Sequence, residues 1–179
     1  MKLPRLLLLI GVGAALAAPP AMIDKDSVKT FYRKFTRLTK EPMEVGRILS
    51  IACVGLPSPG KIEAQEKKSG PHLGSWVHYY ANNEAVPTYR TQKYPFQIGS
   101  VIVKEKLAKD GTVAGVGGMR KREAGFDASH GDWEFFYTDA KTGFQIGSLK
   151  TCVECHSTAK AFDHVFTAAR VLIEPKRKR

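Results

Sequence analysis

Cysteine, tryptophan and histidine are scarce in this chain of 179 residues, which contains 3 cysteines, 2 tryptophans and 5 histidines. A structural zinc site needs four ligands, usually supplied as two Cys or His pairs at similar spacing. Only Cys152 and Cys155 form a close pair, and Cys53 stands alone far upstream. The composition therefore argues against a zinc-stabilised fold. Internal repeats and low-complexity segments are also lacking, and the length indicates one domain with a substantial core.

Long apolar runs are missing after the first residues of the chain. Residues 1–17 have the pattern of an export signal, with Lys2 and Arg5 before an apolar stretch at 6–16 and an A-x-A cleavage site at 15–17. That stretch is too short to span a bilayer comfortably, and no cysteine follows it for lipid attachment. We therefore expect a cleaved signal peptide, a periplasmic mature protein and no membrane span after cleavage.

Acidic residues are outnumbered, with 17 Asp and Glu against 28 Lys and Arg, for a formal net charge of +11. Loss of Lys2 and Arg5 with the signal would lower this charge by two. A basic protein can bind nucleic acid, an anionic membrane surface or an acidic protein. Export argues against nucleic acid, so an acidic redox partner is the sharper hypothesis. Residues 174–179 are expected to form a solvated basic tail.

The most informative stretch is C-x-x-C-H at residues 152–156. This pattern is the attachment signature of a c-type haem, in which two thiols form thioethers and the adjacent histidine ligates iron. A thioredoxin-like redox pair would lie near an early strand of a βαβ unit, whereas this pair lies near the C-terminus. A chance match is the remaining alternative. The sequence predicts one covalent haem c, held by Cys152 and Cys155, with His156 as the metal ligand.

The hydrophobic periodicity changes along the chain. Helical spacing of apolar residues predicts an amphipathic helix over 21–40, and another helix is expected over 159–173. Between them, residues 75–81, 100–107, 112–123 and 133–139 are predicted strands, with a hairpin turn at 109–111. Glycines at 115, 117 and 118 indicate a bulge or tight packing. We expect an α+β fold over residues 18–173, an antiparallel sheet with flanking helices and the haem motif near the C-terminus.

Two common classes of haem protein do not fit this order of elements. An ordinary electron-transfer cytochrome c is helical, has an early motif and supplies a methionine far downstream, but no methionine follows His156. A four-helix cytochrome c′ has a late motif but would be helical throughout, which the predicted strands exclude.

The chain resembles the cytochrome P-460 family, which includes cytochrome c′-beta. The similarity covers most of the mature chain and is carried by residues 99–105 (GSVIVKE), 131–136 (GDWEFF), 152–156 (CVECH) and 163–166 (DHVF). The resemblance implies an antiparallel sheet with flanking helices, a homodimer and a haem whose distal side is open to small nitrogen oxides. Members named for their absorbance band oxidise hydroxylamine and carry a lysine joined to the haem. That lysine falls on Lys104 here.

Alternation along the predicted strand places Ile102, Lys104 and Lys106 on one face and the neighbouring valines on the other. Lys104 would then point away from helices that pack on the valine face. A solvated strand lysine is the alternative, and a lysine nucleophile needs a low-dielectric site. The crosslink at Lys104 is therefore a hypothesis at this stage.

Three functions remain open, namely hydroxylamine oxidation, nitric oxide binding without turnover, and electron transfer by a six-coordinate haem. Oxidation needs a proton acceptor, but residues 147–151, where the family places one, contain no acid. Other residues could substitute. The candidate acids are Glu105, Glu123 and Glu134; the aromatic residues that could crowd a distal face are Phe96, Phe126, Trp133 and Phe136; and the histidines that could provide a sixth ligand are His72, His78, His130 and His164.

Overall fold

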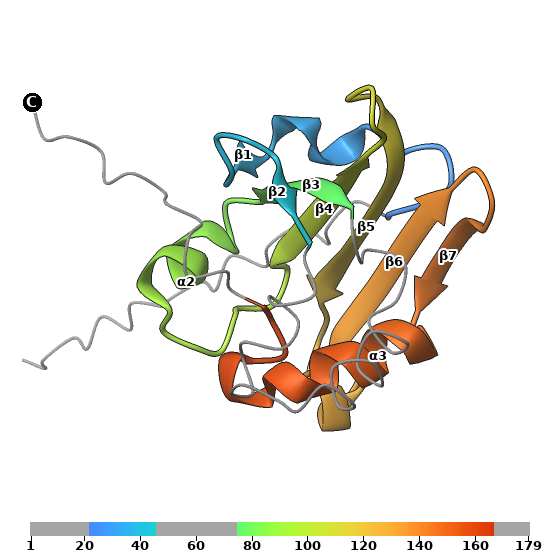
Figure 1. Ribbon diagram of the computed structural model, residues 1–179. Coiled ribbons are helices and arrows are strands. Elements are labelled where there is room, and N and C mark those ends of the chain that lie inside the picture. The colour runs from blue at the N-terminus through green and yellow to red at the C-terminus, as the bar shows by residue number, and fades with distance from the viewer. Residues whose placement is uncertain (1–21, 46–74, 167–179) are drawn as a thin grey trace, which may run out of the picture.

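The computed structural model describes residues 22–45 and 75–166. Within them the chain forms one antiparallel sheet of seven strands, in the order β1–β3–β4–β5–β6–β7, with β2 pairing beside β1 on the outer edge of β3 (Figure 1). The strands are β1 (Thr36–Arg37), β2 (Met43–Glu44), β3 (Trp76–Ala81), β4 (Val101–Leu107), β5 (Val113–Lys121), β6 (Trp133–Asp139) and β7 (Gly143–Gly147). The expected α+β class with an antiparallel sheet is confirmed.

The helices of the described residues are short. The α-helices are α2 (Val86–Thr91) and α3 (Lys150–His156), and the 3-10 helices are η1 (Phe31–Lys34), η4 (Ala128–His130) and η5 (Ser157–Phe162). No helix in the described ranges is long and apolar enough to cross a membrane.

The four strands predicted from periodicity are confirmed with small shifts of their ends. The turn between β4 and β5 is also confirmed: Gly111 has a φ of +82°, and the Ala108 N–H donates to the Thr112 carbonyl at 2.8 Å. The predicted irregularity near the glycines occurs where the register between β4 and β5 shifts at Lys106 and Leu107. Glycine allows the backbone conformation that this turn requires.

The two faces of the sheet pack against different parts of the chain. Ile102, Met119 and Phe135 belong to a buried cluster against which Cys152 and Val153 of α3 pack. Val101, Val103 and Phe136 belong to a second cluster that contains Val28 and Tyr32 of the N-terminal segment. Figure 1 shows the blue N-terminal segment and the orange-red α3 on opposite sides of the sheet. The valine face of β4 is thus covered by the N-terminal segment, and Lys104 belongs to the α3 face.

The predicted amphipathic helix over residues 21–40 is wrong. Its described part consists of turns, the single-turn η1 and the short strand β1. Val28, Tyr32 and Leu38 are buried as expected of its apolar positions. The backbone is extended after Phe35 because β1 pairs with β3, and the Leu38 N–H donates to the Tyr79 carbonyl at 2.8 Å. Sheet pairing therefore overrides the local helical pattern.

The helix expected over 159–173 is also wrong in its described part. The short 3-10 helix η5 ends at Phe162, and Asp163 and His164 adopt left-handed conformations with φ of +53° and +61°. A carboxylate at Asp163 that bonds to other segments stops the helix here. Residues 167–173 lie outside the described residues.

Six described elements were not predicted from the sequence: β1, β2, β7, α2, α3 and η4. Each is short, and α2 contains a proline and β-branched residues that are weak helix formers. Other sequence expectations lie outside the described residues, namely the signal peptide, Cys53, His72 and the basic tail.

Candidate functional site

The C-x-x-C-H stretch forms the short helix α3, which follows the edge strand β7. Positions three apart lie on the same side of a helix, so Cys152 and Cys155 share one side of α3. Both thiols are partly buried, and neither is in a disulfide. Burial raises the pKa of both thiols. The two thiols therefore lie on one side of α3, as attachment to two positions on one molecule requires.

The imidazole of His156 is held in one orientation by its neighbours. Its ring centre lies 5.0 Å from that of Phe135 and 5.1 Å from that of Phe166. Nδ1 lies 2.7 Å from the carbonyl oxygen of His164. A carbonyl can only accept, so Nδ1 carries the hydrogen and Nε2 keeps its lone pair for a metal.

The protonation state of His156 suits a metal ligand. Burial, and next the charge of Lys104, lower the pKa of His156 to about 3. The ring is therefore neutral at physiological pH, which is the form that ligates metals. The two thiols and the free Nε2 fit the groups that hold a c-type haem.

Lys104 lies close to this helix, on the α3 face of β4. Its Nζ lies 5.7 Å from the centre of the Tyr79 ring and 6.0 Å from that of Phe166. The Lys104 charge opposes the effect of burial on the pKa of Cys152 and of Cys155. The four residues singled out in the sequence, two thiols, an imidazole and an amine, thus come together in space.

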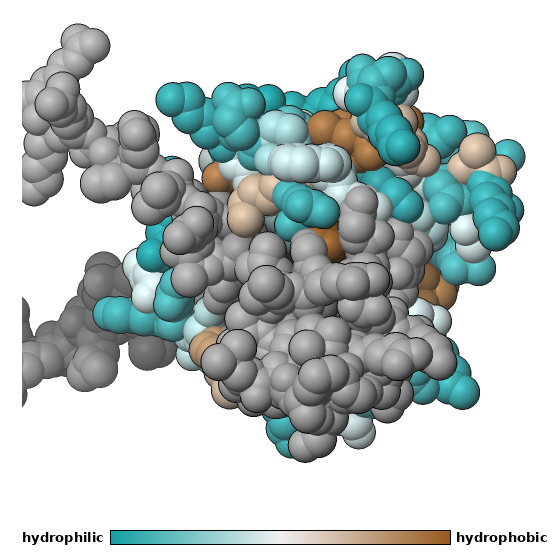
Figure 2. All heavy atoms as spheres, viewed as in Figure 1, coloured by the Kyte–Doolittle hydropathy of each residue, from teal (hydrophilic) through white to brown (hydrophobic). Residues whose placement is uncertain are grey.

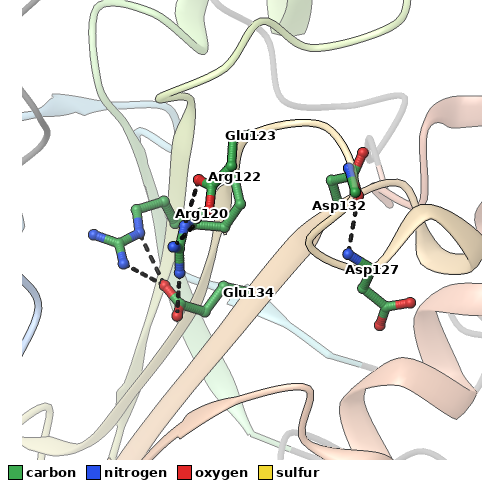
Figure 3. A network of polar contacts seen from close by, with 7 residues as sticks. Arg120, Arg122, Glu123, Asp127, Asp132 and Glu134 are labelled. Atoms are coloured by element: carbon green, nitrogen blue, oxygen red, sulfur yellow. Dashed lines mark hydrogen bonds and ion pairs between the residues drawn. The ribbon is translucent and has the colours of Figure 1, made fainter.

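The carboxylates considered as proton acceptors do not lie on this face. Glu105 lies on the opposite face of β4 from Lys104. There it accepts hydrogen bonds from the hydroxyls of Tyr32 (2.5 Å) and Tyr80 (3.1 Å). Glu134 lies on the opposite face of β6 from Phe135. It accepts hydrogen bonds from the guanidinium groups of Arg120 in β5 and Arg122 just after β5 (Figure 3). Glu105 is therefore held by tyrosine hydroxyls and Glu134 by arginines, and both have a structural role.

Glu123 is the third carboxylate, and it lies at the surface. Its side chain is mostly exposed and forms an ion pair with Arg122 at 2.9 Å. Arg122 also forms an ion pair with Glu134 (Figure 3). The Arg122 guanidinium lowers the pKa of Glu123. Glu123 therefore belongs to this arginine network.

Sequence reasoning missed an acid on the α3 face. Tyr137 and Asp139 lie on the same face of β6 as Phe135, and the Tyr137 hydroxyl donates to Asp139 Oδ2 at 2.7 Å. Asp139 also accepts from the backbone N–H groups of Thr142 and Lys141. The bond from Thr142, and next that from Tyr137, lower the pKa of Asp139 to about 2. A carboxylate with so low a pKa is a weak base at neutral pH. Alternation along β6 was the signal that could have found this pair.

The aromatic residues expected to crowd a distal face are not gathered there. Phe96 and Trp133 pack together in the core at 5.7 Å, and Phe136 packs against Phe31 on the far face of the sheet. Phe126 lies against the guanidinium of Arg122 at 4.6 Å. Phe96 and Trp133 belong to the cluster against which Cys152 packs, whereas Phe136 belongs to the cluster on the opposite face, so the four rings do not form one group. The rings near His156 and Lys104 are those of Tyr79, Phe135 and Phe166.

Among the described histidines other than His156, His78 and His130 have polar partners elsewhere, whereas the buried Nδ1 of His164 has no hydrogen-bond partner. His78 contacts Thr39 Oγ1 at 3.0 Å, on the face opposite Lys104. His130 contacts Asp127 at 2.8 Å, and His164 packs near His130 with its ring centre 6.2 Å away. None of these three contacts favours the hypothesis of a sixth ligand.

Comparison with known families supports the same part of the chain. A family model described as cytochrome P460 matches residues 61–167, which include β4, β6 and the whole of α3. No curated protein matches the chain.

Proposed function

Because the chain belongs to the cytochrome P460 family, we propose that it is a c-type haem protein that binds small nitrogen oxides and oxidises hydroxylamine. The family implies a haem cofactor. The finer proposal, covalent attachment and turnover, rests on the residues of α3 and on Lys104.

Cys152 and Cys155 would hold one haem through thioether bonds, and His156 would ligate its iron through Nε2. When bound, the haem supplies an iron that takes up electrons from a coordinated nitrogen ligand. The hydrogen bond from Nδ1 to the His164 carbonyl fixes the ring orientation and makes the imidazole a stronger donor.

The observation that carries the proposal is the position of Lys104. A covalent bond between a lysine and the haem requires that the amine reach the ring. Lys104 is partly buried near the rings of Tyr79 and Phe166, and it lies close enough to Cys152, Cys155 and His156 to affect the pKa of each. This surrounding supports a covalent bond between Lys104 and the haem, as in hydroxylamine-oxidising members of the family.

One observation favours a second function, nitric oxide binding without turnover. Residues 147–151 contain no acid, and Asp139 is engaged in a turn and is a weak base. Without a proton acceptor, oxidation of hydroxylamine would be slow, while binding of an uncharged ligand would be unaffected.

The test compares the wild-type holoprotein with Lys104→Ala, using Lys106→Ala as the control on the same face of β4. The proposal expects a red-shifted Soret band in the ferrous wild-type protein. It also expects mass spectrometry to detect a haem peptide that includes the peptide of Lys104. It also expects reduction of an electron-accepting dye that depends on hydroxylamine. Lys104→Ala should lose all three properties, and Lys106→Ala should keep them.

Other spectra would contradict the proposal. An ordinary five-coordinate high-spin spectrum without turnover would establish the nitric oxide-binding function. Sharp low-spin α and β bands would establish an electron-transfer protein instead.

We further propose export to the periplasm with cleavage after residue 17, a homodimer and an acidic redox partner. The export pattern supports the cleavage, the excess of basic residues supports the acidic partner, and the family supports the homodimer. On the face shown in Figure 2, most described side chains are hydrophilic, with small hydrophobic groups between them. N-terminal sequencing and the mass in solution would test cleavage and dimerisation.

A further inference from the structure

The segment that follows η5 contains two consecutive left-handed residues that are not glycine. Asp163 has a φ of +53° and His164 a φ of +61°. L-residues other than glycine rarely adopt this conformation, and each instance costs free energy. Such strain persists only where the surroundings impose it.

The surroundings of Asp163 supply that constraint. Its carboxylate accepts hydrogen bonds from Lys121 Nζ at 2.7 and 2.8 Å and from the Phe96 N–H at 2.8 Å. Its carbonyl accepts the Trp133 Nε1–H at 2.7 Å. The Lys121 and Asp163 side chains are both about nine-tenths buried, so this ion pair is largely screened from water.

The same turn is packed from a third side by Gly131. A Cβ at Gly131 would lie 2.9 Å from Cδ2 of His164 and 3.0 Å from Oδ1 of Asp163. The loop before β6 therefore fits against the turn only with glycine at this position. Residues 131–133 and 163–164, far apart in the sequence, meet here.

This turn directs one group toward the haem motif. The carbonyl that follows Asp163, that of His164, accepts the Nδ1–H of His156 at 2.7 Å. If the turn relaxed to an ordinary conformation, this carbonyl would point elsewhere and Nδ1 would lose its acceptor.

We propose that the buried Lys121–Asp163 ion pair positions the His164 carbonyl against His156 and thereby tunes the iron ligand. This inference rests on the proposed haem attachment. A hydrogen bond from Nδ1 raises the donor strength of an axial imidazole, and a stronger donor stabilises the ferric state. Lys121 and Asp163 are positioning residues: they act on the iron only through His164 and His156.

The test uses the holoprotein and two readouts, the iron–histidine stretching band of the ferrous protein and the reduction potential. Asp163→Asn keeps a residue that tolerates the left-handed conformation but removes the ion pair. Lys121→Met leaves the bonds to Phe96 and Trp133 in place. Both variants should move the stretching band to lower frequency and raise the potential.

Lys121→Met separates positioning from charge. Loss of a positive charge by itself would lower the potential, so a rise is the opposite of the simple electrostatic result. Lys121→Arg should restore the wild-type band. Lys160→Met, the loss of an exposed lysine near Asp163 in sequence, should leave the band unchanged.

The outcomes distinguish this inference from the proposed function. A wild-type protein that binds no haem overturns both. A haem-loaded wild-type protein with His156 as ligand, whose band and potential stay unchanged in Lys121→Met, overturns the positioning role alone. If Asp163→Asn does not fold, the comparison of Lys121→Met with Lys121→Arg still tests the positioning role.

Discussion

Gly118 of β5 lies opposite Val103 of β4 and Phe136 of β6, where there is no room for a side chain. A Cβ at this position would lie 2.5 Å from the Ile102 carbonyl oxygen and would overlap the ring of Phe136. Phe136 is fully buried and packs against Phe31, so its ring has little room to move. The absence of a side chain at Gly118 is what allows this aromatic residue to lie flat on the sheet.

Gly118→Ala should therefore destabilise the protein by about 1 to 3 kcal/mol, the usual cost of overpacking a core. Gly115→Ala is the graded comparison, because a Cβ there would meet the Thr138 carbonyl oxygen at 3.0 Å. Urea denaturation of both variants measures the difference. An equal or larger loss for Gly115→Ala would contradict this account of β5.

A second prediction at the residue scale concerns His78 at the edge of the sheet. Burial, and next the charge of Arg37, lower the pKa of His78 below its ordinary value of 6.5. Thr39 Oγ1 accepts the Tyr79 N–H at 3.2 Å, and its hydroxyl is placed to donate to the unprotonated Nδ1 of His78. Protonation of Nδ1 would break that bond.

The sign of the pH dependence follows from the lowered pKa of His78. The stability contributed by the neutral ring is complete above pH 6.5 and is lost as pH falls through the lower pKa of the folded state. An NMR titration should give a midpoint for His78 below 6.5, and His78→Gln should destabilise the protein less at acidic than at neutral pH. A midpoint at or above 6.5 would rule this out.

At the scale of the element, the N-terminal segment is fixed to the sheet by a buried polar contact. Glu105 of β4 lies on the face that this segment covers, and it accepts hydrogen bonds from Tyr32 at 2.5 Å and from Tyr80 at 3.1 Å. The two tyrosine rings pack edge to face, with centres 5.1 Å apart. Burial and then the bond to Glu105 raise the pKa of Tyr32, so the hydroxyl stays protonated and donates.

Tyr32→Phe should cost about 1.5 to 3 kcal/mol of unfolding free energy, since it removes a hydrogen bond to a buried charged group. Tyr80→Phe removes a longer hydrogen bond to the same carboxylate, donated by a less buried hydroxyl. It should therefore lower the unfolding free energy by less. Thermal or urea unfolding gives both values. The order would be reversed if Tyr80 were the main partner of Glu105.

At the scale of the whole molecule, the sheet separates two layers with different tasks. The N-terminal segment stabilises one face through Val28, Tyr32 and Glu105. The other face carries α3 and Lys104, together with the turn at Asp163. Because side chains alternate along each strand, neighbouring residues such as Lys104 and Glu105 serve opposite layers.

The net positive charge predicts how the holoprotein exchanges electrons. Reduction of ferricyanide, a trianion, by the ferrous protein should slow as ionic strength rises from about 10 to about 150 mM, since the Debye length falls from about 30 to about 8 Å. Reduction of the cationic hexaammineruthenium(III) should accelerate over the same range. Stopped-flow measurements test both, and the same salt dependence for both acceptors would contradict electrostatic steering.

The local sequence was sufficient to predict the four long strands, the turn at Gly111 and the family to which the chain belongs. These features depend on short-range properties: alternation of apolar residues, the conformational freedom of glycine and the fixed spacing of two thiols and a histidine. The position of Lys104 on one face of its strand follows from the same alternation.

Only the tertiary structure decided what each face meets. Residues 21–40 have helical spacing, but pairing with β3 extends part of them. The helix expected over 159–173 stops at Phe162, where Asp163 bonds to partners from β5 and the loop before β4. Glu105 and Glu134 were candidate bases until packing placed them with tyrosines and arginines. The contacts that govern His156 join residues far apart in the chain, and no local pattern encodes such partners, because they form only when the sheet brings distant segments together.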